Sequence, residues 1–285
     1  MQFTFKTQPY EHQQQVFDAS WDSRSWALFL EMGTGKTKVT IDTVAKLYCD
    51  GEIDTAVVIA PKGVYGNWVH KEIPQHLPDD IPLKVVQWQP NLTQTFKGEL
   101  LQLANDKEHL KILVMNVESF STKKGVDVAK WFVKRNRNCL VAVDESTSIK
   151  NRTAKRTKNI VALGKEAKYK RILTGSPITK NPMDLYAQCA FLGTDLLGFD
   201  SYYAFQGRYA VITQRKFGNR SFQDITGYRN LDELNVKLND FSSRVLKEDC
   251  LDLPEKIYTQ RNVALTKEQE RAYKQMQDMA LAMLE

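Results

Sequence analysis

Short apolar segments rich in branched side chains alternate with stretches of helical periodicity between about residues 25 and 195. The apolar segments lack the in–out alternation of half-exposed strands, and this predicts strands that are buried on both faces. Buried strands that alternate with helices form a mostly parallel sheet covered by helices. The sequence therefore predicts an α/β fold with a doubly wound, mostly parallel sheet.

The expected elements follow directly from these segments. We expect strands at residues 26–30, 55–60, 83–87, 112–115, 139–143 and 169–173. We expect helices at residues 36–49, 67–76, 92–105, 126–134, 154–163 and 183–192.

The composition and pattern of the sequence change after residue 195. Residues 196–245 are aromatic and polar and carry the turn signals FGNR and ITGYRN, which favour a small helical and hairpin insertion. Residues 266–285 have the pattern of one amphipathic helix opened by Thr266. That helix lacks a C-cap signal, so we expect the natural polypeptide to continue past Glu285. The predicted domains are residues 1–195, residues 196–250, and a linker with its helix at residues 251–285.

Composition is that of an ordinary globular protein, with 42% hydrophobic and 26% charged residues among 285. No apolar run approaches the ~18 residues that a membrane span needs. The N-terminus has no signal-peptide pattern. The four cysteines are widely separated, which suggests neither a zinc site nor a disulfide framework. We therefore expect no membrane partner and a reducing, cytoplasmic setting.

Positive charge is concentrated in one part of the chain. Residues 123–171 contain 15 Lys and Arg against 4 Asp and Glu, a net charge of +11, whereas the whole chain carries +6. Two interpretations stay open: a solvated lysine-rich surface, or a surface that faces an anion such as a nucleic-acid backbone.

A glycine-containing turn joins the first expected strand to the helix after it. The residues expected to bind nucleotide here are Gly33, Thr34, Gly35, Lys36 and Thr37. Glycines let the backbone fold around phosphates, and the helix N-terminus presents N–H groups to them. Lys36 would contact the β- and γ-phosphates of ATP, and the Thr37 hydroxyl would coordinate Mg²⁺. The turn departs from the strict GxxxxGK[ST] pattern, because Leu30 stands where the first glycine is expected.

Two carboxylates, Asp144 and Glu145, follow the apolar strand at residues 139–143. The carboxyl edge of an α/β sheet is where ligand chemistry is placed. Asp144 would hold Mg²⁺, and Glu145 would activate the attacking water as general base. An acidic pair alone is also a common strand end, and it is the phosphate loop that favours the catalytic interpretation.

Six segments, in consistent order, resemble motifs of SNF2-like superfamily 2 helicases and DNA translocases. DESTSIKNRTAK at 144–155 resembles their DEAH-containing segment, and RILTGSPITKN at 171–181 resembles their motif III region. The other matching segments are PYEHQ at 9–13, PKGVYGNW at 61–68, VMNVESF at 114–120 and LKEDCLDLPEK at 246–256. Ser146 and Thr147 stand where the family has Ala-His, and Ser176 stands where it has a threonine.

The resemblance implies the N-terminal RecA-like P-loop NTPase lobe of a two-lobed motor, bacterial or phage in type. It implies an ATPase that depends on nucleic acid, most specifically on duplex DNA, and that translocates along it with Mg-ATP. The second RecA-like lobe, which carries an arginine finger, is then a required partner. Without it we expect slow hydrolysis, since such an arginine contributes about 10³–10⁵ in rate. A cytoplasmic location follows for a bacterial or phage protein, and a nuclear one for a eukaryotic protein.

The resemblance also assigns roles to individual residues. Gln13 would read the adenine, or would simply begin a helix. Thr174 and Ser176 would couple the γ-phosphate to DNA, or would cap the turn before Pro177. The residues expected to face DNA are Lys62, Asn67, Ser119, Lys150 and Asn151. For Lys150 and Asn151 internal packing is an equal alternative, and Trp68 is better explained as core.

Two other function classes are weighed against the motor lobe. A P-loop kinase for a metabolite predicts an acceptor pocket and an arginine lid, and it gives no reason for the IKN and LTGSP segments. A stand-alone module that binds nucleotide or DNA with little turnover fits the missing second lobe, although Lys36 and Glu145 are both intact.

Overall fold

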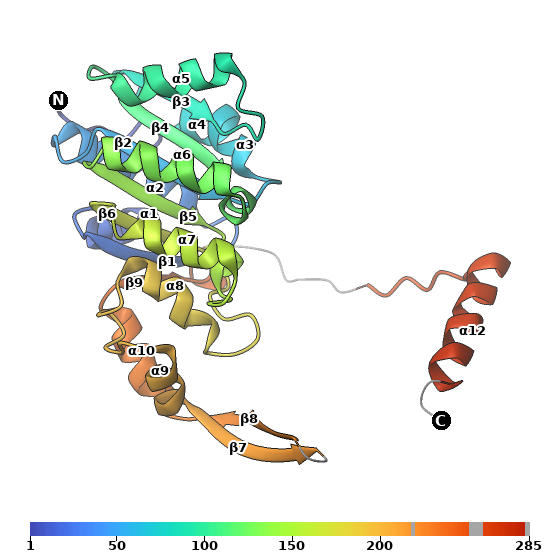
Figure 1. Ribbon diagram of the computed structural model, residues 1–285. Coiled ribbons are helices and arrows are strands. Elements are labelled where there is room, and N and C mark those ends of the chain that lie inside the picture. Colours follow the sequence, from blue (N-terminus) through green and yellow to red (C-terminus); the bar gives the residue numbers. More distant parts are fainter. Residues whose placement is uncertain (218–219, 251–258, 283–285) are drawn as a thin grey trace. The chain divides into compact units, whose positions relative to one another are not determined.

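The computed structural model describes residues 1–217, 220–250 and 259–282. Its main unit, Met1–Leu251, is built on a seven-stranded parallel sheet with strand order β3-β4-β2-β5-β6-β1-β9 (Figure 1). The strands are β1 (Ser25–Leu30), β2 (Thr55–Ala60), β3 (Leu83–Gln87), β4 (Leu110–Asn116), β5 (Cys139–Asp144), β6 (Tyr169–Leu173) and β9 (Ser242–Val245). The predicted doubly wound, mostly parallel α/β sheet is confirmed.

Helices cover both faces of this sheet (Figure 1). The longer ones are α1 (Glu11–Ser20), α2 (Lys36–Cys49), α5 (Gln94–Asn105), α6 (Lys123–Arg135), α7 (Lys155–Gly164) and α8 (Asp184–Leu192). Between β2 and β3, α3 (Tyr65–Asn67), a π-helical turn (Trp68–Glu72) and α4 (Ile73–His76) form one continuous helical segment. The expected helix at 67–76 therefore begins two residues earlier and is locally wider than an α-helix.

Alternate residues of the central strands enter two separate hydrophobic cores. In β2, Val57 and Ile59 belong to the core under α5, α6, α7 and α8, whereas Ala56 and Val58 belong to the core under α1, α2 and α4. Both sides of the strand are apolar, so its sequence shows no alternation.

Capping side chains set the helix boundaries that periodicity alone places less well. Thr93 Oγ1 accepts a hydrogen bond from Phe96 N at 3.2 Å, so α5 begins at Gln94. Thr122 Oγ1 accepts one from Gly125 N at 3.2 Å, so α6 begins three residues before the expected position. Both threonines use the usual N-cap geometry.

Residues 196–250 contain the expected helices and hairpin. They form α9 (Tyr202–Tyr209), β7 (Ala210–Phe217), β8 (Arg220–Tyr228), α10 (Leu231–Asn239), β9 and α11 (Lys247–Cys250). β7 and β8 pair antiparallel. Phe205, Tyr209 and Leu234 share the core of α8, and β9 joins the main sheet beside β1, with Ala27 opposite Ser242.

A second unit, Asp252–Glu285, contains α12 (Lys267–Ala282). Its start is the expected one, because Thr266 and Gln269 exchange hydrogen bonds of 3.0 and 3.3 Å in a capping box. Tyr273, Met276 and Met279 are exposed. Of the linker and helix expected at 251–285, residues 251–258 and 283–285 lie outside the described residues. Across the described ranges, no helix is both long and apolar enough to cross a membrane.

Candidate active site

The phosphate loop connects β1 to α2 through two left-handed glycines. Gly33 has φ +89° and Gly35 has φ +93°, a region that favours glycine. Thr34 is buried, and its backbone N–H and its hydroxyl both donate to Glu31 O, at 3.2 and 2.8 Å. The loop is therefore closed on itself, and it leads into the N-terminus of α2, where helical N–H groups lack intrahelical partners.

Gln13 packs directly on this loop. It is 5% exposed, and its Nε2 donates to Thr34 O at 3.3 Å while its Oε1 accepts from Tyr10 N at 3.1 Å. A Cβ placed on Gly35 would lie 2.8 Å from Gln13 Cδ. The structure thus brings Gln13 to the nucleotide loop, where glycine is required at position 35 for space as well as for φ.

The two acids lie at the carboxyl end of β5, facing the phosphate loop. Lys36 Nζ is 3.1 Å from Glu145 Oε1, and Thr174 Oγ1 donates to Glu145 Oε2 at 3.4 Å. Glu145 has φ +46°, an uncommon value for a residue with a side chain. Asp144 Oδ1 accepts the Glu145 backbone N–H at 2.9 Å. Lys36, Glu145 and Thr174, from three different elements, form one contiguous polar group.

Asp144 is buried, and sequence reasoning did not identify its partner. Trp68 Nε1 donates to Asp144 Oδ2 at 3.0 Å, and the two residues are 3% and 6% exposed. Burial raises the pKa of Asp144, and the Trp68 hydrogen bond and the Lys36 charge oppose that rise. Trp68 is therefore a core residue, as expected, but one whose polar end touches the site.

The oxygen donors present suit a magnesium ion. Asp144 and the half-buried Thr37 supply a carboxylate and a hydroxyl, the hard ligands that Mg²⁺ prefers. Among residues 1–217, 220–250 and 259–282, no three His, Cys, Asp or Glu side chains cluster as a metal site. A Mg²⁺ ion that also binds substrate phosphates and water usually has only one or two protein ligands.

A hydrogen-bonded bridge links the acidic turn to the segment after β6. Ser146 Oγ donates to Gln188 Oε1 at 2.7 Å, and Gln188 Nε2 donates to Pro177 O at 2.8 Å. Ser146 and Gln188 are fully buried. Thr174 Oγ1 also accepts the Ser176 N–H at 3.2 Å. The serine that departs from the family pattern thus contributes a structural contact that an alanine lacks.

Ser176 itself is exposed and faces a cavity. The cavity has a volume of about 350 Å³ and is lined on one side by Ser176, Pro177 and Ile178 and on the other by α10 and Arg244. Arg244 donates to Gly175 O at 2.9 Å, which fixes the wall of the cavity.

A second cleft, of about 290 Å³, lies at the carboxyl ends of β2 and β4. Its lining includes Lys62, Tyr65, Asn116, Ser119 and Lys124. Ser119 is 5% exposed, and its hydroxyl donates to Asn116 O at 2.6 Å. The expected Lys62 and Ser119 are brought together here, with Lys124 as an additional cation.

The remaining residues expected to face DNA lie elsewhere. Asn67 is exposed outside this lining. Lys150 contacts the Thr179 hydroxyl and lies 3.9 Å from Asp184 Oδ2. Asn151 Oδ1 accepts both the N–H and the hydroxyl of Thr153, at 3.0 and 2.8 Å. Lys150 and Asn151 therefore have local contacts of the kind that the packing alternative describes.

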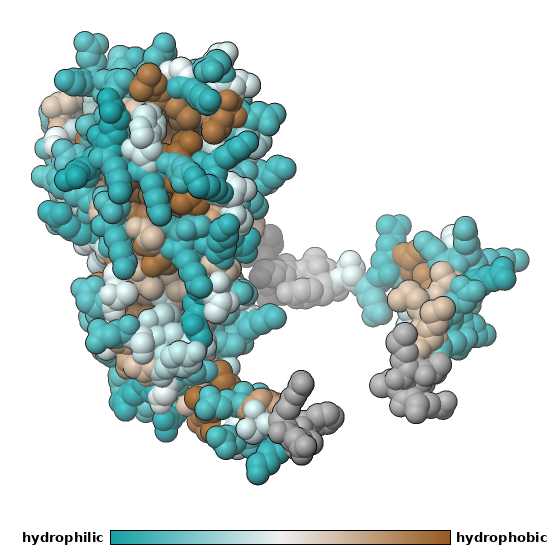
Figure 2. All heavy atoms as spheres, viewed as in Figure 1, coloured by the Kyte–Doolittle hydropathy of each residue, from teal (hydrophilic) through white to brown (hydrophobic). Residues whose placement is uncertain are grey.

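The basic segment divides between surface and interior. Exposed cations include Lys123, Lys134, Lys155 and Lys158, and Figure 2 shows a mostly hydrophilic surface over α5, α6 and α7, with apolar side chains in small patches. Arg171, by contrast, is fully buried and donates to Ser20 O at 2.7 Å. Burial lowers the pKa of Arg171 to about 9.

Lys247 is a second cation beside the phosphate loop that sequence reasoning missed. Its backbone N–H donates to Glu31 Oε2 at 2.8 Å. Its Nζ lies 3.9 Å from the position that a Cβ on Gly33 would take. It follows β9, a strand of four residues, so no local pattern placed it near residue 33.

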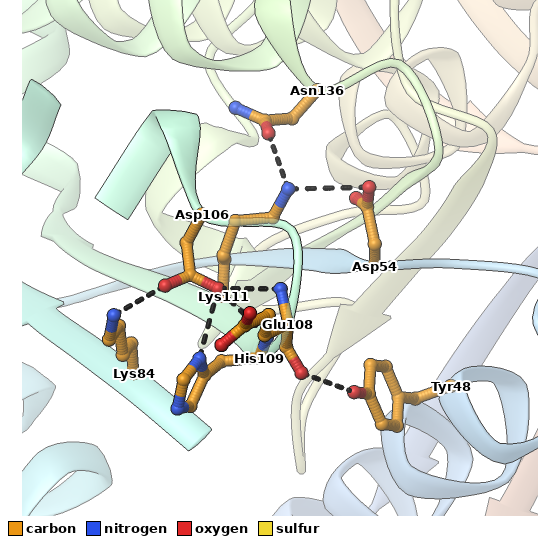
Figure 3. Close-up of polar contacts among 8 residues, drawn as sticks. All are labelled: Tyr48, Asp54, Lys84, Asp106, Glu108, His109, Lys111 and Asn136. Atoms are coloured by element: carbon orange, nitrogen blue, oxygen red, sulfur yellow. Dashed lines mark hydrogen bonds and ion pairs between the residues drawn. The ribbon is translucent and has the colours of Figure 1, made fainter. Parts of the chain in front are cut away.

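A separate polar network lies at the amino ends of the strands (Figure 3). Lys111, 3% exposed, donates to Asn136 Oδ1 at 2.8 Å and lies 3.3 Å from Asp54 Oδ2. Asp106 pairs with Lys84 and, at 3.0 Å, with His109 Nδ1. Because these groups satisfy one another at the edge opposite Asp144, the network is structural.

Comparison with known proteins agrees with this geometry. A sequence model of the SNF2-related domain matches residues 11–285. The chain is 30% identical over 235 residues to the mouse DNA annealing helicase and endonuclease ZRANB3, covering 80% of this chain and 20% of that protein. It is 28% identical over 264 residues to the yeast (Saccharomyces cerevisiae) TATA-binding protein-associated factor MOT1, covering 83% of this chain and 13% of that protein.

A solved structure has the same arrangement. The Sulfolobus solfataricus SWI2/SNF2 ATPase core in complex with dsDNA superposes with a TM-score of 0.64 and 25% sequence identity, covering 95% of this chain and 52% of that one. The chain thus spans about a fifth of the mouse relative and about half of the archaeal core.

Proposed function

Because the chain belongs to the SNF2-related domain family, we propose that it is the ATP-binding lobe of a DNA-dependent ATPase that translocates on duplex DNA. The observation that supports this most is the convergence of Lys36, Glu145 and Thr174 at the carboxyl edge of the sheet. A P-loop lysine that binds phosphates and a residue that positions the attacking water are recurring parts of sites that hydrolyse nucleoside triphosphates, and Glu145 contacts both Lys36 and Thr174.

ATP would lie on the phosphate loop, with Lys36 on its β- and γ-phosphates. Thr37 and Asp144 would hold Mg²⁺, which when bound neutralises phosphate charge. Phosphate oxygens compete with Glu145 for the Lys36 ammonium, because both are anions and the pair is only 3.1 Å apart. As Lys36 turns to the phosphates, Glu145 becomes available to accept a proton from the attacking water.

Thr174 would report this exchange to the rest of the lobe. Its hydroxyl contacts Glu145 on one side and the Ser176 N–H on the other. A change in the position of Glu145 would therefore move Thr174 and, through it, the backbone at Ser176. We propose Thr174 and Ser176 as the coupling pair. Gln13 would hold the phosphate loop through its bond to Thr34 O. Its second N–H and the second lone pair of its amide oxygen would form hydrogen bonds with the adenine.

Duplex DNA would bind at the cleft that contains Lys62 and Ser119. Two cations, Lys62 and Lys124, line it, and contacts to phosphates carry little sequence preference. The archaeal SWI2/SNF2 core to which the chain is similar was solved with dsDNA. Asn67 would contact the duplex outside this cleft. Lys150 and Asn151 would act within their own segment, where Lys150 contacts Thr179 and Asn151 contacts Thr153.

A second RecA-like lobe would complete the site. The chain covers about half of the archaeal core, and a stabilising arginine supplied from another lobe contributes about 10³–10⁵ in phosphoryl-transfer rate. We therefore infer weak hydrolysis by this lobe alone and strong, duplex-stimulated hydrolysis by a two-lobed protein.

Nucleotide binding and turnover by the 285-residue chain test this proposal. We expect the chain to bind Mg-ATP. We expect slow ATP turnover in each of four conditions: without nucleic acid, with single-stranded DNA, with duplex DNA and with duplex RNA. Lys36→Ala should abolish binding. Lys46→Ala is the matched control, because Lys46 lies on the same helix and pairs with Asp50 at 2.7 Å, outside the site. Normal Mg-ATP affinity in Lys36→Ala would overturn the proposal.

A further inference from the structure

The Trp68 indole N–H donates a hydrogen bond to the carboxylate of Asp144, the last residue of β5. The 3.0 Å bond from Nε1 to Asp144 Oδ2 is buried at both ends. A buried tryptophan N–H usually finds a hydrogen-bond acceptor. Here the acceptor is a charged side chain of the nucleotide site.

The bond fixes the carboxylate in one orientation. Oδ2 accepts from Trp68, and Oδ1 accepts from the Glu145 backbone N–H at 2.9 Å. Each carboxylate oxygen has a further acceptor position, so both oxygens remain able to bind a cation. Hydrogen bonds from a second layer of residues orient metal-binding carboxylates, and losing one typically costs about 10- to 100-fold in metal affinity.

Trp68 is also placed on an unusual backbone element. It begins the π-helical turn Trp68–Glu72 inside the helical segment that runs from Tyr65 to His76. Single π turns occur mostly inside α-helices, and they are frequent at functional sites. Here Trp68, the first residue of the turn, donates to Asp144, while Tyr65, three residues earlier, lines the cleft with Lys62.

One short segment therefore contacts two sites. Its first residue, Tyr65, borders the cleft at the ends of β2 and β4, and its fourth, Trp68, holds Asp144. A helical segment is stiff over one turn, so a displacement at Tyr65 moves the indole N–H as well.

We propose that Trp68 is a positioning residue for Asp144, and that the segment from Tyr65 to His76 transmits duplex DNA binding in the Lys62 cleft to the magnesium–nucleotide site. This inference rests on the function proposed above. It adds one specific contact, the hydrogen bond from the Trp68 indole N–H to Asp144, as the link between the Lys62 cleft and the nucleotide site.

Trp68→Phe tests the proposal, because it keeps an aromatic side chain and removes the N–H. Trp26→Phe is the matched control. Trp26 Nε1 donates to Ser243 Oγ at 3.0 Å, near the amino end of β1 and away from Asp144. ADP binding is measured by calorimetry with and without Mg²⁺. We expect Trp68→Phe to weaken the Mg²⁺-dependent affinity about 10- to 100-fold and to leave magnesium-free binding unchanged. Equal behaviour of the two variants would overturn the positioning role.

Transmission is tested by measuring Mg-ADP affinity with and without a short DNA duplex. We expect the duplex to change the affinity about fivefold or more in the unmodified chain, and this factor to approach one in Trp68→Phe but not in Trp26→Phe. A factor that persists in Trp68→Phe would overturn transmission through this residue.

A spectroscopic measurement on the unmodified chain covers the case in which Trp68→Phe does not fold. The Trp68 indole N–H resonance should shift when Mg-ADP is added and again when duplex is added, whereas the Trp26 resonance should not. An unmoved Trp68 resonance with Mg-ADP bound would overturn the inference and leave the proposed function intact. Failure of the unmodified chain to bind Mg-ADP would instead overturn the proposed function.

Discussion

Lys36 Nζ lies 3.1 Å from Glu145 Oε1, and this ion pair joins the first turn of α2 to the residue after β5. The two residues are 109 positions apart in the chain and meet because β1 and β5 are separated in the sheet only by β6. The Lys36 and Glu145 side chains are 11% and 36% exposed. The pair is therefore accessible to an incoming anion, which would replace Glu145 as the partner of Lys36.

Replacing Glu145 by glutamine should separate binding from hydrolysis. The amide keeps the size of the side chain, removes the charge that competes for Lys36, and cannot act as a base. We expect Mg-ATP affinity to be retained and turnover by the two-lobed protein to fall at least about 100-fold. Normal turnover in Glu145→Gln would show that another group is the base.

Gly35 should be intolerant of a side chain for two independent reasons. Its φ is +93°, and a Cβ would lie 2.8 Å from Gln13 Cδ. Gly51 is the matched control, with φ +74° and nothing within 4 Å of a Cβ. We expect Gly51→Ala to lower the free energy of unfolding by about 1–2 kcal/mol, and Gly35→Ala to lower it further and to lose Mg-ATP binding.

The comparison of the two glycine variants is made by chemical denaturation. Gln13→Ala in the Gly35→Ala background should recover part of the lost stability, because it removes the crowding and leaves the φ strain. Equal destabilisation in Gly35→Ala and Gly51→Ala would show that Gln13 moves aside.

Gln188→Leu should destabilise the main unit. Gln188 is fully buried, accepts from Ser146 Oγ, and donates to Pro177 O and Asp184 O, each at 2.8 Å. Leucine leaves these buried groups without their partner, which costs about 3 kcal/mol in unfolding free energy. Gln102→Leu on the exposed face of α5 should change it by less than about 0.5 kcal/mol. Similar denaturation midpoints for both would contradict the bridge.

Stability should depend on pH through Asp42. Burial raises the pKa of Asp42 to about 6 from its usual 3.8, although Lys38 lies 2.7 Å away, and Asp42 Oδ1 has no hydrogen-bond partner. The folded chain therefore holds a proton that the unfolded chain has lost between these two values. Stability from this group is complete below about 3.8 and falls as the pH rises through 6, by at most about 3 kcal/mol.

Asp42→Asn removes this contribution. We expect the unfolding free energy of the unmodified chain, measured relative to Asp42→Asn by denaturant titration, to decline from pH 4 to pH 6 and then level off. A difference that is constant across this range would show that Asp42 stays ionised in the folded chain.

Sequence patterns within a few residues predicted those strands and loops that are determined by neighbouring residues. β1, β2 and β5 contain continuous apolar segments, and the phosphate loop and the acids directly follow two of them, so their placement at one sheet edge could be anticipated. Ser119 was expected at a DNA-facing surface; it lines the cleft with Lys62 but is only 5% exposed, and its hydroxyl donates to Asn116 O. Composition and spacing do not reveal such a local hydrogen bond.

The contacts that were missed join distant parts of the chain. β9 has only four residues, SSRV, and pairs with β1 more than 200 positions earlier. Helical periodicity places Trp68 in the core but cannot show that its N–H reaches Asp144, 76 residues further on. The π turn that begins at Trp68 has no recognised sequence signal.

β9 has a further consequence for how the chain leaves its main unit. The Glu31 N–H donates to Val245 O at 3.1 Å, and its carboxylate accepts the Lys247 N–H at 2.8 Å. The first residue of the phosphate loop thus holds the last strand and the start of α11 with two bonds. Both bonds belong to the main unit, so a rearrangement of the phosphate loop at Glu31 would also move the end of β9 and the start of α11.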